Sequence, residues 1–225
     1  MKHALIGLAL VAATASMSAA QAAPFVLTFE GLGNLEAVNE YYNGGLGGNG
    51  SGPGPNFGVS FSGNSLAIID ADAGGTGNIG GEPTPDTVLF FLTGTAIMNV
   101  AAGFSDGFSF FYSAINNPGS ISVYDGLNGS GNLLASLQLP VTPSDGGDPT
   151  GNFSPFFPVG VAFQGVALSI DFGGTVNQIA FDNITFGSDD PCEGDECVVP
   201  EPGSLALLSL GLLGLAASRR RRFWS

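Results

Sequence analysis

Between Pro24 and Ser188 the chain consists of short apolar runs that glycine, asparagine and proline interrupt every few residues. Almost none of these runs repeats at the period of a helix, so we expect them to be strands. Asn43-Gly44, Asp125-Gly126 and Asn128-Gly129 separate them, and these residue types tolerate the positive φ of tight turns. The pattern predicts an all-β domain over residues 24–187, an antiparallel β-sandwich of jelly-roll-like form.

Ten runs are predicted strands, and the two stretches richest in glycine and proline, Asn43 to Pro55 and Gly74 to Pro85, are predicted loops. The strands are Phe25 to Phe29, Val59 to Phe61, Leu66 to Ile69, Thr87 to Leu92, Ala96 to Val100, Phe108 to Tyr112, Ile121 to Tyr124, Leu133 to Leu139, Val161 to Ile170 and Gln178 to Phe186.

The N-terminal segment has the order of a secretion signal. Lys2 and His3 precede the apolar run from Ala4 to Ala15, and small residues follow at alternate positions in Ala20-Gln21-Ala22. This order predicts a signal peptide over residues 1–23, cut by signal peptidase after Ala22 or Ala23, with a buried helix as the alternative.

The charges are segregated along the chain. All five Lys and Arg residues lie in the terminal segments, and between Pro24 and Pro202 there is no Lys, Arg or His, whereas all nineteen carboxylates lie there. A domain without cations cannot neutralise phosphates, which argues against nucleic acid as a partner and against docking on anionic lipid. It also has no His for a triad or a zinc site, and its oxygen ligands leave calcium as the one cofactor to expect.

Residues 188–198 form an acidic run, which predicts an extended linker. It contains both cysteines, Cys192 and Cys197. Because an exported chain passes through an oxidising compartment, we expect a small-loop disulfide between them, with a thiol metal site or free thiols as alternatives.

The C-terminal segment, residues 199–225, combines three features in order. Pro200-Glu201-Pro202 comes first, the apolar run from Gly203 to Ala217 follows, and Arg219, Arg220, Arg221 and Arg222 come after it. A helix of this length crosses a membrane only marginally, and the arginines would keep its end on the cytoplasmic side. The β domain would then lie outside the inner membrane.

This combination resembles the PEP-CTERM sorting signal. The resemblance implies that an exosortase cuts the chain near Pro200-Glu201-Pro202 in a Gram-negative bacterium that makes extracellular polysaccharide. The transmembrane helix would then be temporary, with an ordinary tail anchor as the alternative. The phenylalanine-rich body is also similar to domains commonly attached to this signal.

Two short segments at the ends of the β domain carry a second resemblance. The apolar parity of Gln178 to Phe186 slips at Asp182-Asn183, which predicts a β-bulge. First and last strands often lie side by side in jelly rolls. Phe29-Glu30 at the start and Asp182-Asn183-Ile184 at the end are similar to sugar-binding jelly-roll modules that hold a structural calcium between those two strands. The resemblance implies calcium ligation by Glu30 and Asp182. Backbone carbonyls and Asp70 or Asp72 would complete six or more oxygen ligands. A plain bulge in which Asp182 caps backbone N–H groups is the alternative.

Three functions compete at this stage. The first is a non-catalytic component of the cell envelope, outer surface or extracellular polysaccharide matrix. The second is a calcium-stabilised carbohydrate-binding module, for which Tyr41 and Tyr42 would contact sugar. The third is a glycosidase that uses paired carboxylates from among many acids. We expect the first function, with polysaccharide as a partner, and we expect no enzyme. The acids that could serve a glycosidase are expected on the solvated surface: Glu36, Glu40, Asp70, Asp72 and Glu82.

Overall fold

The structure, a computed structural model, describes residues 25–105, 107–144 and 151–191. Every regular element in these ranges is a β-strand, which confirms the all-β fold. The same ranges contain no helix long and apolar enough to cross a membrane. The predicted signal peptide and the predicted C-terminal transmembrane helix both lie outside the described residues.

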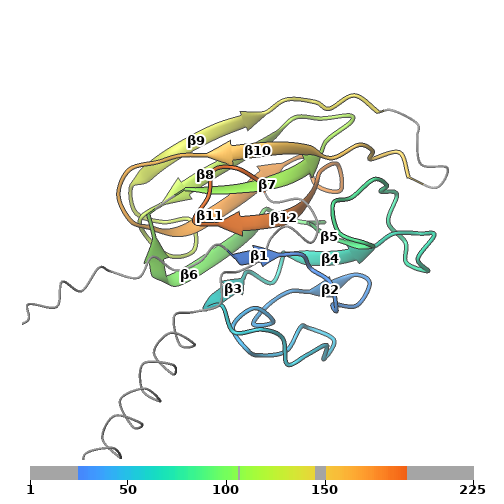
Figure 1. The fold of residues 1–225 in the computed structure, drawn as a ribbon, viewed down its shortest axis with the longest axis horizontal. Helices are drawn as coiled ribbons and strands as arrows, with labels where there is room; N and C mark the ends of the chain where they lie inside the picture. Colours follow the sequence, from blue (N-terminus) through green and yellow to red (C-terminus); the bar gives the residue numbers. More distant parts are fainter. Residues whose placement is uncertain (1–24, 106, 145–150, 192–225) are drawn as a thin grey trace, which may run out of the picture.

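Two antiparallel sheets make up the domain (Figure 1). The seven-stranded sheet runs in the order β10 (Phe157–Val161), β7 (Phe108–Ser113), β12 (Ala180–Phe186), β5 (Thr87–Phe90), β4 (Leu66–Ile69) and β2 (Glu36–Ala37), with β1 (Phe25–Leu27) paired to β12. The five-stranded sheet runs in the order β3 (Val59–Phe61), β6 (Ala96–Phe104), β11 (Ala167–Gly174), β8 (Gly119–Tyr124) and β9 (Leu133–Leu139).

One hydrophobic core fills the space between the two sheets. Phe172 from the five-stranded sheet meets Phe110 and Phe181 from the seven-stranded sheet, with ring centroids 5.9 Å and 5.0 Å apart. All three side chains are fully buried. The edge-on ring geometry brings the positive edge of one ring to the negative face of another, which adds to the burial of apolar area. The sheets therefore form a β-sandwich.

A second, smaller apolar cluster lies on the outer face of the seven-stranded sheet. Val88 and Phe111 alternate with core residues along β5 and β7, so they point away from the sandwich interior. Ile79 and Phe156 cover them from the two long connections that precede β5 and β10. These loops are therefore packed against the sheet and build a surface above it.

The predicted strands Val59 to Phe61, Leu66 to Ile69 and Leu133 to Leu139 have the observed bounds. The single strand predicted from Val161 to Ile170 is wrong: β10 ends at Val161, β11 begins at Ala167, and Gly165 between them has φ +100°. Two strands, β2 and β10, were missed. β10 contains a proline and a glycine, which weaken a strand signal but are tolerated at the sheet edge that it forms.

The predicted bulge and the predicted neighbourhood of the first and last strands are both confirmed. β1 pairs with β12, so that Phe25 lies opposite Phe186 and Leu27 opposite Ile184. The register of β12 against β7 shifts between Asp182 and Thr185. The two ends of the domain therefore lie side by side.

Phe172→Ala removes a buried ring of the five-stranded sheet that packs against three rings of the seven-stranded sheet. We expect the free energy of unfolding to fall by about 3–5 kcal/mol, because a buried aromatic side chain is lost and a cavity is left behind. Urea denaturation measures this effect. Leu133→Ala is the control: its side chain is 56% exposed, and we expect a change within about 0.5 kcal/mol. Equal effects of the two changes would contradict the assigned core.

Candidate functional site

The residues predicted to act in sorting, and the two cysteines predicted to form a disulfide, lie outside the described residues. This holds for Pro200, Glu201 and Pro202, for Arg219, Arg220, Arg221 and Arg222, and for the cysteines Cys192 and Cys197. The described β domain contains the other predicted site residues: Glu30, Tyr41, Tyr42 and Asp182.

Glu30 and Asp182 come together where β1 ends beside the bulge of β12. Phe29, directly before Glu30, has a left-handed backbone with φ 62°, and Asn183, directly after Asp182, has φ 46°. Such conformations are strained for residues other than glycine and need support from their surroundings. The Tyr42 hydroxyl provides it at Phe29 by accepting the backbone N–H at 2.5 Å. The two turns aim both carboxylates at the segment before β5.

The Glu30 carboxylate holds the start of β5. Its Oε1 accepts the backbone N–H of Thr87 at 2.8 Å and that of Asp86 at 3.1 Å. Its Oε2 accepts the Thr87 hydroxyl at 3.2 Å. Bonds between a carboxylate and N–H groups are charge-assisted and stronger than neutral ones. Glu30 therefore stabilises the exit of the long β4–β5 loop.

Asp182 is fully buried and holds the same loop two residues earlier. Its Oδ2 accepts the Thr84 hydroxyl at 2.9 Å and the Thr84 N–H at 3.2 Å, and its Oδ1 accepts the Asn183 N–H at 2.7 Å. Burial raises the pKa of Asp182 well above its ordinary value, and the nearby Glu30 raises it further, while the hydrogen bonds from Asn183 and Thr84 act in the opposite direction. The folded state thus favours the protonated carboxyl.

The structure brings Glu30 and Asp182 to the same loop, and calcium ligation by them stays a prediction. Calcium takes about six to eight oxygen ligands. Among the described residues, no group of three or more Asp, Glu, His or Cys side chains is placed to hold a metal. Asp70 is buried, so the surface position expected for it is wrong, and it accepts the N–H of Ala71 within its own turn. Asp72 is exposed, as expected. Asp182 caps the backbone N–H groups of Thr84 and Asn183, as the alternative that the sequence left open expects.

Asp182→Asn should alter how stability depends on pH. In the wild type, stability decreases as pH rises from the unfolded-state pKa, about 3.9, through the raised folded-state pKa, because the folded state binds the proton more tightly. The amide has no proton to lose, so we expect the melting temperature of the variant to rise relative to wild type across this window. Calorimetry at a series of pH values measures the difference.

Asp125→Asn is the matched control for that experiment. Hydrogen bonds from Asn132 lower the pKa of Asp125, so its contribution has the opposite sign and is lost as pH falls. A pH profile of Asp182→Asn that parallels wild type would contradict the assignment.

Glu36 organises the glycine-rich loop between β2 and β3. Its side chain is fully buried. Its Oε1 accepts the N–H groups of Asn49 and Ser51 at 2.8 Å and 3.1 Å, and its Oε2 accepts the Gly33 N–H at 2.6 Å and the Ser51 hydroxyl at 2.5 Å. Burial acts to raise the pKa of Glu36, but these hydrogen bonds outweigh it and hold the pKa below its ordinary value. The surface position expected for Glu36 is wrong, because four donors replace its water shell.

Glu36→Gln should lower the free energy of unfolding by about 1–3 kcal/mol at neutral pH, since the new NH₂ group meets the Gly33 N–H donor. The folded-state pKa of Glu36 lies below the unfolded one, so its stabilisation is present above the unfolded-state pKa and is lost as pH falls through the folded-state pKa. The difference from wild type should therefore shrink in acid. Guanidinium denaturation at several pH values measures it.

Glu40→Gln is the matched control for Glu36→Gln. Glu40 is exposed and accepts one side-chain hydrogen bond, from Asn43 at 2.9 Å. We expect a change within about 0.5 kcal/mol at every pH. A smaller effect of Glu36→Gln than of this control would refute the role of Glu36.

Tyr41 and Tyr42 lie in the core, where their rings meet edge to face at 5.2 Å. Their exposed fractions are 9% and 3%, so neither offers the open ring face that sugar stacking requires. Phe57 is 37% exposed, and its ring stacks with those of Phe25 at 4.7 Å and Tyr42 at 6.3 Å. Sugar contact at Tyr41 and Tyr42 therefore finds no support.

A pocket of about 300 Å³, which the sequence did not reveal, opens on the outer face of the seven-stranded sheet. Ile68, Phe90 and Ala180 of β4, β5 and β12 line its base, with Phe153 beside them. Its polar lining comes from three separate connections, and we call the whole the amide pocket. These polar residues are Thr76, Asn78, Asn116, Asn177 and Gln178. No local motif marks it, because its residues are far apart in the sequence.

Comparison with protein families gives one finding, at the C-terminus. Residues 198–222 match the family model described as the PEP-CTERM protein-sorting motif. The chain therefore carries this motif, as the resemblance implied. No curated protein matches the sequence.

Comparison with solved structures gives remote likenesses of the β domain. The K2 cleaved adhesin domain of Lys-gingipain is 14% identical, with 73% of this chain and 99% of that chain covered and a TM-score of 0.40. The carbohydrate-binding module CBM6cm-2 from Cellvibrio mixtus lichenase 5A, in complex with cellotriose, is 10% identical, with 56% and 88% covered and a TM-score of 0.31. The K1 cleaved adhesin domain from Porphyromonas gingivalis W83 is 11% identical, with 56% and 96% covered and a TM-score of 0.29. These scores are too low to transfer a ligand or an activity.

Proposed function

We propose that this chain is an exported, non-catalytic protein of the cell envelope or extracellular polysaccharide matrix, sorted and cut by an exosortase near Pro200-Glu201-Pro202. The observation that carries the proposal is the match of residues 198–222 to the PEP-CTERM protein-sorting motif. That motif implies export and surface sorting in a Gram-negative bacterium. Signal peptidase would remove residues 1–23 on the way.

The charge distribution supports this topology. The arginines at 219–222 follow the apolar run and would remain on the cytoplasmic side, because positive residues resist translocation. All nineteen carboxylates precede them and would be exported. The β domain, of jelly-roll-like form in this proposal, would then face the outside until the enzyme separates it from the membrane helix.

The position of the domain ends also supports it. Phe25 pairs with Phe186, so the residues that follow the signal peptide lie beside those that lead into the acidic linker. Cutting both terminal segments would leave the paired strands β1 and β12 in place. The folded domain is therefore compatible with processing at either end.

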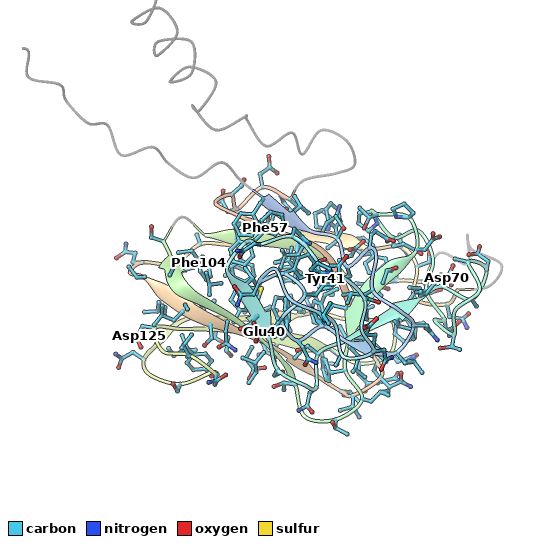
Figure 2. The ribbon with its side chains drawn as sticks, turned by 90° about the horizontal axis from the view of Figure 1, so that it is seen from below. Glu40, Tyr41, Phe57, Asp70, Phe104 and Asp125 are labelled. Atoms are coloured by element: carbon cyan, nitrogen blue, oxygen red, sulfur yellow. The ribbon has the colours of Figure 1, made fainter. Side chains whose placement is uncertain are left out.

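The environment of Glu36, one of the acids that the sequence suggested for catalysis, supports a non-catalytic role. Glu36 is buried and accepts four hydrogen bonds, which leaves it unsuited to proton transfer with a substrate. Asp70 and Asp125 lie at opposite ends of the domain (Figure 2). A glycosidase needs two carboxyl groups about 5–9.5 Å apart on either side of a substrate.

The test is expression of the full chain, with an epitope in the β domain, in a Gram-negative host that has an exosortase and in the same host without it. In the first host we expect a shortened product in the surface or extracellular fraction. In the second, and for Glu201→Ala in the first, we expect the uncut chain in the inner membrane. Mass spectrometry of the product measures both ends.

Glu196→Ala in the acidic linker is the matched control, and it should be cut and sorted as the wild type is. A wild-type product in the cytoplasm that retains residues 1–22 and the arginine cluster would refute the proposal. Equal processing with and without the exosortase would refute it as well.

A further inference from the structure

The amide pocket has a rigid base and an accessible polar rim. Its base is formed by residues of three paired strands, β4, β5 and β12. Thr76, Asn78, Asn116 and Asn177 of the rim are exposed, so a ligand can reach their polar atoms. The volume, about 300 Å³, is at the lower end of the range for small-molecule sites, about 300–1,000 Å³. It suits one small ligand or a single unit of a longer one.

Hydrogen bonds hold one side of the rim in place. The Oε1 atom of Gln178 accepts the Asn116 amide at 3.0 Å and the Asn117 amide at 3.4 Å. The Nε2 atom of Gln178 donates to the Asn177 carbonyl at 2.8 Å. These contacts tie the β7–β8 turn to the β11–β12 turn. The amide of Gln178 is therefore oriented before any ligand arrives, which lowers the entropy lost on binding.

Asn78 is fixed in the same way on the opposite side of the rim. Its Oδ1 accepts the backbone N–H of Asn152 at 3.0 Å and the Asn152 side-chain amide at 3.2 Å. Within the described residues, the Nδ2 group of Asn78 and the Oδ1 atom of Asn116 make no hydrogen bond. The rim thus presents Nδ2 of Asn78 as a donor and Oδ1 of Asn116 as an acceptor. The other polar atom of each side-chain amide is held by a hydrogen bond within the protein.

Charge narrows the class of ligand. None of the residues that line the pocket is ionisable, and residues 25–191 contain no Lys, Arg or His. A phosphate, a carboxylate or a zwitterion would lose water in this pocket without gaining a cation in return. A cation would find no carboxylate in the lining. The ligand must therefore be neutral, with hydroxyl groups for the amides and an apolar surface for the base.

We propose that the amide pocket binds one neutral sugar unit of a glycan. Adjacent hydroxyl groups of a sugar ring both donate and accept hydrogen bonds, as side-chain amides do. Its C–H surface suits the apolar base formed by Ile68, Phe90 and Phe153. The inference goes beyond the sorting proposal and does not depend on it, because it concerns the folded β domain alone.

The test is glycan binding by the purified full chain in a detergent that has no sugar head group. The probes are neutral oligosaccharides of glucose, galactose, mannose and xylose, with uronic-acid oligosaccharides and uncharged nucleosides as comparisons. We expect saturable binding of at least one neutral glycan. Titration calorimetry should show that Gln178→Ala and Asn78→Ala each weaken it about tenfold or more, or at least 1.4 kcal/mol.

Gln138→Ala on β9 and Asn64→Ala before β4 are the controls, since they remove exposed side-chain amides outside the pocket, and they should bind as the wild type does. Melting temperatures identify any variant that fails to fold. Nuclear magnetic resonance tests the wild type directly: the side-chain amide signals of Asn78 and Gln178 should shift on titration, and those of Asn64 and Gln138 should not.

Four outcomes would overturn the inference: no neutral glycan binds, only acidic glycans bind, nucleosides bind more tightly than glycans, or Gln178→Ala binds as the wild type does with no shift of the pocket amides. Failure here leaves the processing assay unaffected, and failure of processing leaves this binding assay unaffected.

Discussion

The described domain has no positively charged side chain, so no carboxylate in it can be neutralised by an ion pair within residues 25–191. An acid that is buried must be stabilised by hydrogen-bond donors instead, or it must take up a proton. Glu36 follows the first course and Asp182 moves toward the second, as the opposite shifts of their pKa values indicate. The architecture of the loops follows from this constraint.

Three of the buried or half-buried acids hold long connections in place. Glu36 binds the glycine-rich loop before β3, and Glu30 and Asp182 bind the end of the β4–β5 loop. That loop in turn supplies Thr76 and Asn78 to the amide pocket. Backbone N–H groups thus serve as fixed donors to these carboxylates, and the lining of the amide pocket contains no ionisable residue. Such a surface suits contact with uncharged polymers outside the cell better than contact with anionic lipid or nucleic acid.

Local patterns predicted much of the sheet structure but little of the site. The slip of apolar parity at Asp182 predicted the bulge, because side chains alternate strictly along a strand. β2 was not predicted because two residues are too few to show the alternation of a strand. β10 was not predicted because Pro158 and Gly160 are typical of a turn. Tyr41 and Tyr42 look like surface aromatics in a glycine-rich context. In the structure Tyr42 packs against Tyr41 and Phe61, and Phe61 packs against Phe29, so both tyrosines lie in the core.

By itself the sequence determined the PEP-CTERM sorting motif, the exclusion of cationic chemistry and the all-β class, because each depends on residue order or composition within one segment. Only the tertiary structure decided which acids are buried, which rings are exposed and where the amide pocket lies. Asn78, Asn116 and Gln178 meet because β4, β5, β7 and β12 are neighbours in one sheet. No local sequence pattern predicts that these residues lie together, since strand pairing joins segments that are far apart along the chain.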